Sequence, residues 1–403
     1  MVSDTRQKDT LVTHEGRQPS QHAGTVNMPV YRASTICFPT MAALDHARAN
    51  PLTETTYGIY GTPTVKALER AVAKVEGGYR ALAVGSGLAA ISASILAFAG
   101  AGDHILMVDS VYGPTRKLCE TALRRLAIET TYYDPLSNCD VAALIRPNTK
   151  LIYAESPGSH TFEMQDIPTL AAIAHDAGLP LLMDNSWGTP YHFAAFAHGV
   201  DVSIHAATKY ISGHSDVMLG IISTNEKYFW PVREQIATMG FNASPDDCYL
   251  GLRGWRTIGV RMKQQAENAM KVATWLAQRE EVAEVLYPAL PGAPGHEIWR
   301  RDYTGAASLF GVVLKPCSQD AVNALVDNMD LFTIGASWGG FESLVLPSHP
   351  VPTRSVRAPR GPMVRLHIGL EDPEDLIADL AAGMDRLRKI ATGHSNDDAG
   401  MQR

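Results

Sequence analysis

A regular alternation of short apolar strands with amphipathic helices runs through the first two thirds of the chain and most constrains its fold. Strands are expected at residues 81–84, 104–108, 128–133, 151–154, 181–183 and 201–205, and helices at 68–75, 88–98, 115–126 and 170–177. Short apolar strands separated by helices form a mostly parallel sheet with both faces covered. Ligands of such sheets bind beyond the carboxyl ends of the strands. The sequence therefore predicts an α/β domain with a site at that edge.

The rest of the chain divides into further parts. Residues 1–60 show weak periodicity and are predicted to form an N-terminal arm, followed by the α/β domain at 61–254. One long helix is predicted over 253–280. The later elements are expected as strands near 282–287 and 309–314 and helices near 320–327 and 373–390. They indicate a smaller C-terminal α+β domain at 255–392, and the polar residues 393–403 are predicted to be a disordered tail.

Charge and residue usage exclude several classes of protein. The 403 residues carry a formal net charge of −7 with a pI near 6.1, and no basic run of the kind that nucleic-acid binding requires. No segment reaches the roughly eighteen apolar residues of a membrane span, and the polar N-terminal segment lacks a signal-peptide core. The five cysteines are scattered without metal-ligand spacing. We therefore expect a cytoplasmic protein without nucleic-acid, membrane or metal partners.

The most informative segment is HAATKYISGHSD, from His205 to Asp216, which follows a predicted strand. Lys209 therefore lies at the carboxyl edge of the sheet, where a neutral amine can form an imine with an aldehyde cofactor. Thr208 offers a hydroxyl to a phosphate. A single lysine is usually a solvated surface charge. The whole string is far more specific than its lysine.

This string resembles the cofactor-lysine segment of the Cys/Met-metabolism family of pyridoxal-phosphate (PLP) enzymes, and the resemblance extends over about residues 10–390. It implies PLP fold type I, which is aspartate-aminotransferase-like, with a mostly parallel large domain and a smaller C-terminal α+β domain. It also implies that pyridoxal 5'-phosphate is the cofactor and that Lys209 is joined to it. Lys209 is further expected to move protons during catalysis.

Asp184 ends the apolar run LPLLMD. From the residues alone it is either a helix N-cap or a functional carboxylate. The resemblance implies that this carboxylate pairs with the pyridine nitrogen of the cofactor, where it keeps the ring an electron sink.

The segment GSGLAA at residues 85–90 follows a strand and opens a helix, so its amides suit a phosphate. The same pattern, with Asp109 beyond it, also fits a dinucleotide fingerprint and leaves an NAD-dependent dehydrogenase as an alternative. The resemblance instead assigns the amides of Gly87 and Leu88 and the Ser86 hydroxyl to the cofactor phosphate.

Two tyrosines extend the predicted site. Tyr112 follows another strand end and is either a packing aromatic or, by the resemblance, a residue that stacks on the cofactor ring and takes part in proton transfer. Tyr57 lies in a segment that resembles the family's Y-G-R motif, which binds cofactor and substrate across a dimer. Ile59 stands where that motif has arginine, so a cation at the phosphate is missing. This departure leaves a catalytically inactive binding protein as a further alternative.

Arg365 lies in an apolar strand-like run, and a buried arginine requires a carboxylate ligand or an internal ion pair. The resemblance implies that Arg365 binds the substrate α-carboxylate with Ser337 and Trp338 beside it.

Within the family, Trp338 and the segment ESPGS at 155–159 resemble bacterial cystathionine β-lyases. This resemblance implies β-elimination of cystathionine to homocysteine, pyruvate and ammonia in methionine biosynthesis, by a homotetramer built from dimers that share active sites. A broader carbon–sulfur lyase, a cysteine desulfhydrase or a γ-acting synthase of the same family remains an alternative.

Overall fold

Seven strands form the large sheet of the computed structural model, which describes residues 6–348 and 361–400. In chain order they are β1 (Arg80–Val84), β2 (His104–Val108), β3 (Glu129–Tyr133), β4 (Thr149–Glu155), β5 (Leu181–Asp184), β6 (Val202–His205) and β7 (Gly220–Thr224). Across the sheet the order is β1-β7-β6-β5-β4-β2-β3, and β7 is antiparallel to both of its neighbours while the other pairs are parallel. The predicted mostly parallel α/β sheet is confirmed.

Every residue of β2, β5, β6 and β7 is buried. Both faces of the sheet are therefore covered, as in other sheets flanked by helices. The helices of this part of the chain are α3 (Pro63–Glu76), α4 (Gly87–Leu96), α5 (Gly113–Leu118), η3 (Cys119–Leu123), α6 (Asn138–Leu144), α7 (Ile167–Asp176), α8 (Thr189–His192), η4 (Ala195–His198), α9 (Phe229–Met239) and α10 (Pro245–Trp255). Among the described residues, no helix is both long and apolar enough to cross a membrane.

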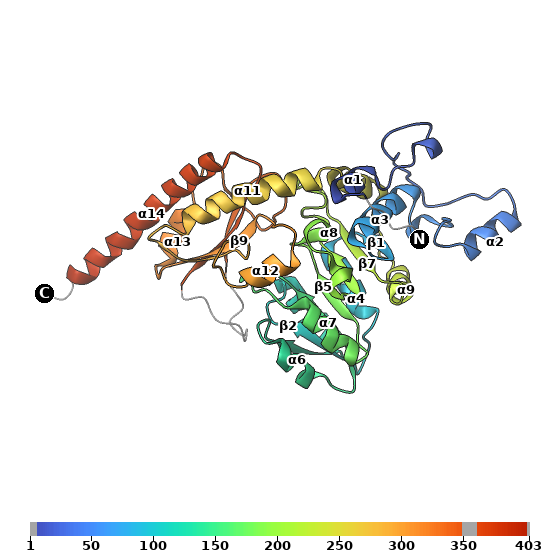
Figure 1. Cartoon of the computed structure of the whole chain (residues 1–403), viewed down its shortest axis with the longest axis horizontal. Helices are drawn as coiled ribbons and strands as arrows, with labels where there is room; N and C mark the ends of the chain where they lie inside the picture. Colours follow the sequence, from blue (N-terminus) through green and yellow to red (C-terminus); the bar gives the residue numbers. More distant parts are fainter. Residues whose placement is uncertain (1–5, 349–360, 401–403) are drawn as a thin grey trace.

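A second, five-stranded sheet forms the smaller domain in the order β10-β11-β12-β9-β8. Its strands are β8 (Val282–Leu286), β9 (Leu309–Leu314), β10 (Thr333–Ile334), β11 (Leu344–Ser348) and β12 (Met363–His367). The accompanying helices are α11 (Ile258–Leu276), α12 (His296–Asp302), α13 (Gln319–Val326) and α14 (Pro373–Gly400). Figure 1 shows α11 extending from the large domain to the smaller one, where it lies near α13 and α14. Helix α14 continues through residues 393–400, which the sequence predicted to be disordered.

The single helix predicted over 253–280 is wrong, because two helices, α10 and α11, meet there with a break at Arg256 and Thr257. The Gly254 carbonyl, which would serve a continuous helix, accepts hydrogen bonds from the Thr257 N–H and from Arg261 Nη2, at 3.1 and 2.8 Å. Gly254 itself is pressed against the backbone of Ser212, where a Cβ atom would come within 2.0 Å of the carbonyl oxygen. The break therefore packs directly on the segment that carries Lys209.

The N-terminal arm contains four short helices, whereas the sequence predicted little regular structure there. They are α1 (Lys8–His14), η1 (Pro19–Gln21), α2 (Met41–Ala49) and η2 (Gly58–Tyr60). Helix α1 packs on α3 and α11, while Figure 1 shows α2 projecting away from both sheets. The arm therefore offers surface that the rest of its own chain does not cover.

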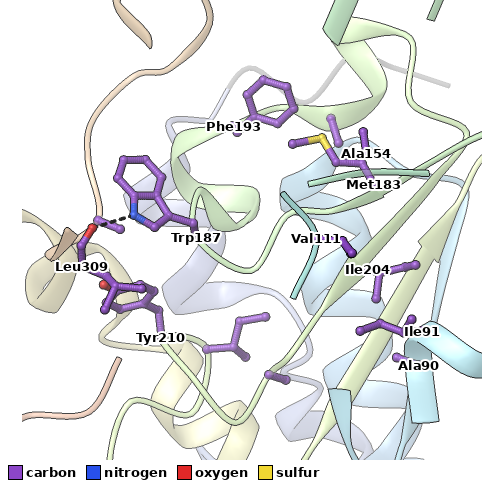
Figure 2. Packing of buried hydrophobic residues seen from close by; sticks show 14 of the residues in the cluster. Ala90, Ile91, Val111, Ala154, Met183, Trp187, Phe193, Ile204, Tyr210 and Leu309 are labelled. Carbon is purple, nitrogen blue, oxygen red and sulfur yellow. Dashed lines mark hydrogen bonds between the residues drawn. The ribbon is translucent and has the colours of Figure 1, made fainter. Parts of the chain in front are cut away.

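An apolar cluster joins the two domains near the end of β5. Figure 2 shows Trp187 directed toward Leu309 of the smaller sheet, and the indole Nε1 donates a hydrogen bond of 3.0 Å to the Leu309 carbonyl. Tyr210, immediately after Lys209, is fully buried in the same region. Large aromatic side chains contribute most of the apolar area in such a contact. The interface consequently fixes the smaller domain beside the carboxyl edge of the large sheet.

Candidate active site

The carboxyl ends of several strands bring the predicted residues to one edge of the large sheet. Because β1 is antiparallel to β7 and β7 to β6, strands β1 and β6 run in the same direction. The loops after β1, β2, β5 and β6 therefore leave the same edge, as the sequence predicted. Gly87, Tyr112 and Lys209 come shortly after β1, β2 and β6, and Asp184 is the last residue of β5.

Lys209 is the amine at the centre of this edge. Its Nζ donates a hydrogen bond of 2.6 Å to Ser337 Oγ and lies 5.2 Å from the ring centroid of Trp338. Burial, followed by the nearby Arg365 charge, lowers the pKa of Lys209 to about 8. A much larger share of the amine is therefore neutral near pH 8 than for an ordinary lysine, which makes it a better nucleophile and base.

Arg261 of α11 holds the Lys209 segment from behind. Its Nη2 donates to the carbonyl oxygen of Tyr210 at 2.8 Å, and its guanidinium packs against Gly213, whose φ of +71° suits glycine. A Cβ atom at Gly213 would overlap Arg261 Nη1 at 1.9 Å. Burial lowers the pKa of Arg261 to about 10. Arg261 is absent from the site predicted from the sequence, because helical spacing alone does not show which loop a side chain reaches.

Asp184 provides a buried carboxylate beside the amine. It accepts a hydrogen bond of 3.0 Å from the Ser186 N–H, and burial raises its pKa against the opposing effects of Ser186, His205 and Lys209. The bond to Ser186 resembles an N-cap, but no helix begins there. The next helix, α8, begins at Thr189, five residues after Asp184. A carboxylate buried at this depth is stabilised by a cationic partner.

Glu155 is a second carboxylate at this edge and is also absent from the predicted site. It ends β4 in register with Asp184 at the end of β5. Its Oε2 accepts the backbone N–H of Tyr112 at 2.7 Å. Burial, followed by the charges of Glu155 and Asp184, raises the pKa of Tyr112, so its phenol stays protonated. The hydrogen bond to Glu155 holds the backbone of Tyr112 in place. The signal in the sequence was an acidic residue closing each of two neighbouring strands.

The N-terminus of α4 lies against the loop that carries Lys209. Ser86 caps the helix by accepting the Ala89 N–H at 3.1 Å. A Cβ atom on Gly87 would come within 2.7 Å of the Ala206 Cβ, so glycine lets the helix end approach the Lys209 loop. Free N–H groups at a helix N-terminus favour a phosphate. Leu88, beside them, is 40% exposed.

The Thr208 hydroxyl is used within the protein. It accepts the Leu219 N–H at 2.9 Å and donates to the Leu219 carbonyl at 3.2 Å. A phosphate would have to compete with that carbonyl for the hydroxyl proton. Phosphate binding by Thr208 therefore stays a prediction.

Arg365 of β12 approaches from the smaller domain. Its Nη2 donates to the carbonyl oxygens of Ala336 and Ser337 at 2.9 and 3.2 Å, and burial lowers its pKa. No carboxylate within the described ranges forms an ion pair with Arg365. The half-buried guanidinium is therefore available to an external carboxylate, as the sequence argument required.

The loop before β11 completes the smaller domain's side of the site. Ser337 reaches Lys209, while the Trp338 ring lies 5.4 Å from that of Tyr210. Both residues are thus brought to the amine as predicted.

Tyr57 lies apart from this group. It is 49% exposed on the N-terminal arm and bridges to Thr35 in an isolated β-bridge. Among the described contacts of the single chain, none joins Tyr57 to Lys209 or Arg365.

The grouped residues fit pyridoxal 5'-phosphate. Lys209 supplies an amine of lowered pKa, Asp184 a buried carboxylate for a protonated ring nitrogen, and the α4 N-terminus an anion site pressed against the same loop. The first and second fit an aldehyde and a pyridine, and the third fits a phosphate. No group of three metal-ligating side chains occurs in the described part of the chain.

Comparisons with known proteins agree with this arrangement. Residues 9–385 match the family model described as Cys/Met metabolism PLP-dependent enzyme. A putative cystathionine beta-lyase of Rhizobium johnstonii is 46% identical over 380 residues, which cover 93% of this chain and 95% of that protein. The cystathionine beta-lyase MetC of Escherichia coli is 41% identical over 389 residues, covering 94% and 98%. A crystal structure of metB from Corynebacterium glutamicum matches with a TM-score of 0.88 and 32% identity, covering 95% and 99%.

Proposed function

Because this chain belongs to the Cys/Met metabolism family of PLP-dependent enzymes, we propose that it is a lyase that cleaves L-cystathionine by β-elimination. The products are homocysteine, pyruvate and ammonia, with one water consumed. The observation that carries the proposal is the half-buried Lys209 amine, which contacts Ser337 beside Trp338 at the edge where Asp184 lies. We also place the enzyme in the cytoplasm, in methionine biosynthesis.

Each residue has a distinct task in this proposal. When bound, PLP supplies an aldehyde that condenses with amines and a protonated ring that accepts electrons from the substrate Cα. Asp184 holds the proton on the ring nitrogen, and the amides of Gly87 and Leu88 bind the phosphate. Arg365 orients the substrate by its α-carboxylate. The geometry and the lowered pKa of Lys209 support these roles.

Proton movement centres on Lys209. Its neutral Nζ takes the Cα proton of the substrate, and the resulting ammonium returns a proton to the leaving sulfur. The Ser337 hydroxyl accepts a hydrogen bond from Nζ and so orients the amine. Burial keeps the Tyr112 phenol protonated. Tyr112 would pack against the cofactor ring and assist as an acid.

Tyr57 is assigned to the active site of a second copy. Its exposure on the arm and its separation from its own Lys209 support a dimer with shared sites, and we propose that two such dimers form a homotetramer. Mixing Tyr57→Ala chains with Lys209→Ala chains tests this sharing. Dissociation and reassembly should restore roughly a quarter of the wild-type activity, since half of the dimers are mixed and each has one intact site. Absence of any recovery in verified mixed dimers would exclude sharing.

The reaction is tested by one spectrum and one product assay. The purified holoenzyme should show a visible absorption band that borohydride removes and that Lys209→Ala lacks. Cystathionine should yield pyruvate, the β-elimination product, whereas γ-elimination would yield 2-oxobutyrate. A band with 2-oxobutyrate as the main product would leave the family intact and overturn the proposed reaction.

A further inference from the structure

A cavity lies away from Lys209, between the N-terminal arm and the outer edge of β1. Its volume is about 770 Å³. The arm contributes the stretches 52–54 and 58–61, and α3, β1 and α9 form the other walls. A cavity of this size can enclose a small molecule.

The walls of this cavity carry an excess of positive charge. Five basic and three acidic residues line it, a difference of +2. Four of the basic residues, named here the cation cluster, are Lys66, Arg70, Arg80 and Arg233. No ion pair within 4 Å joins any of the four to a carboxylate in residues 6–348 and 361–400. None of the four therefore has a carboxylate at ion-pair distance among the described residues, while Glu15, Glu54 and Glu69 attract three of them from farther away.

The cation cluster donates hydrogen bonds to neutral oxygens rather than to anions. Lys66 Nζ donates to the Glu54 carbonyl at 2.7 Å, Arg233 Nη2 to the Pro51 carbonyl at 3.0 Å, and Arg70 Nη2 to Gln18 Oε1 at 3.4 Å. Arg80 Nε is buried without a hydrogen-bond partner in the described part of the chain. A buried guanidinium donor without an acceptor is costly. The site is therefore short of acceptors.

Of the three carboxylates that line the cavity, Glu69 attracts three members of the cation cluster without forming an ion pair with them in the described part of the chain. Glu69 is turned toward β1, where its Oε1 accepts the Ala83 N–H at 2.9 Å. Burial raises the pKa of Glu69, and burial lowers the pKa values of Lys66, Arg70 and Arg233. These opposite shifts have one cause, the removal of charged groups from water.

We propose that this cavity binds a small polyanion, a compound with two or more phosphate or carboxylate groups, through the cation cluster. Several guanidinium forks arranged around one space suit such groups, because each fork can make two parallel charged hydrogen bonds. The proposed ligand is distinct from the cofactor and the amino-acid substrate, and the proposal does not depend on the reaction proposed above.

Calorimetric titration of the PLP-saturated enzyme tests the proposal. Saturation blocks the cofactor site, and inorganic pyrophosphate and citrate serve as the phosphate and carboxylate probes. At least one probe should bind saturably at about one site per chain. The double variant Arg70→Gln with Arg80→Gln should bind that probe at least about tenfold more weakly. The control, Arg124→Gln with Arg125→Gln, removes two exposed charges elsewhere and should not change the affinity.

Thermal unfolding supplies a second measurement. The bound probe should raise the melting temperature of the wild type and of the Arg124/Arg125 control but not that of the Arg70/Arg80 variant. If that variant fails to fold, Arg233→Gln alone should show the same loss. No saturable binding of either probe to the wild type would overturn the proposal. Equal binding by the cavity variants would overturn it as well.

Discussion

Replacing Arg365 with alanine should sharply weaken the use of substrate. In the structure Nη2 donates to the carbonyls of Gly335, Ala336 and Ser337, and the described residues offer no hydrogen-bond acceptor to Nε or Nη1. These free donors can bind a carboxylate in a bidentate manner. Loss of one partner of a buried charged pair costs about 2–5 kcal/mol. At about 1.4 kcal/mol per factor of ten, kcat/KM should fall between roughly 30-fold and several thousand-fold.

The assay is pyruvate release from cystathionine at a series of concentrations. Most of the loss should appear in KM, because the α-carboxylate is bound before and during the reaction. Arg365→Lys keeps the charge but not the planar fork, so its activity should lie between those of the wild type and the alanine variant. Arg124→Ala removes an exposed charge and serves as the control. A kcat/KM within about threefold of wild type in Arg365→Ala, with the visible band intact, would refute the assignment.

Three further outcomes are expected. Since the pKa of Lys209 is lowered to about 8 and the neutral amine attacks the aldehyde, cofactor loading of the PLP-free protein should speed up with pH and level off above about pH 8; a rate still rising at about pH 10 would contradict this. Asp184→Asn should keep the visible band but lose roughly 10²–10³-fold in kcat, and undiminished turnover would remove Asp184 from the mechanism. Glu155→Ala should lower kcat/KM about tenfold by releasing the Tyr112 backbone, whereas Glu155→Gln, which retains an acceptor oxygen, should recover most of it; equal losses in both variants would contradict a positioning role.

Residues fixed by local sequence were the ones that could be predicted. Lys209 and Asp184 each follow an apolar strand, and parallel strands bring their carboxyl ends to one edge. The glycine at 87 was predicted from the strand–helix junction, and the structure adds the reason for it, its contact with Ala206. Fold class followed from the same alternation, because periodicity reports which faces are buried.

Contacts between distant segments could not be predicted in this way. Arg261 reaches the Tyr210 carbonyl across 51 residues, and Glu155 reaches Tyr112 across 43. Helical periodicity predicts that Arg261 lies on a helix but not what its guanidinium meets. The break between α10 and α11 could not be predicted for a similar reason. The Gly254 carbonyl bonds to Thr257 and to the distant Arg261, and no proline or glycine pair marks the position in the sequence.

The contact between Lys209 and Ser337 makes the reactive amine a tie between the two domains. When Nζ forms a covalent bond, it has fewer hydrogens to donate to Ser337. The loop before β11, which carries Ser337, keeps its backbone hydrogen bonds from Arg365. Arg365 is the group assigned to the incoming carboxylate. We therefore expect occupation of Lys209 to remove one of the contacts that hold this loop, which also carries the acceptors of Arg365.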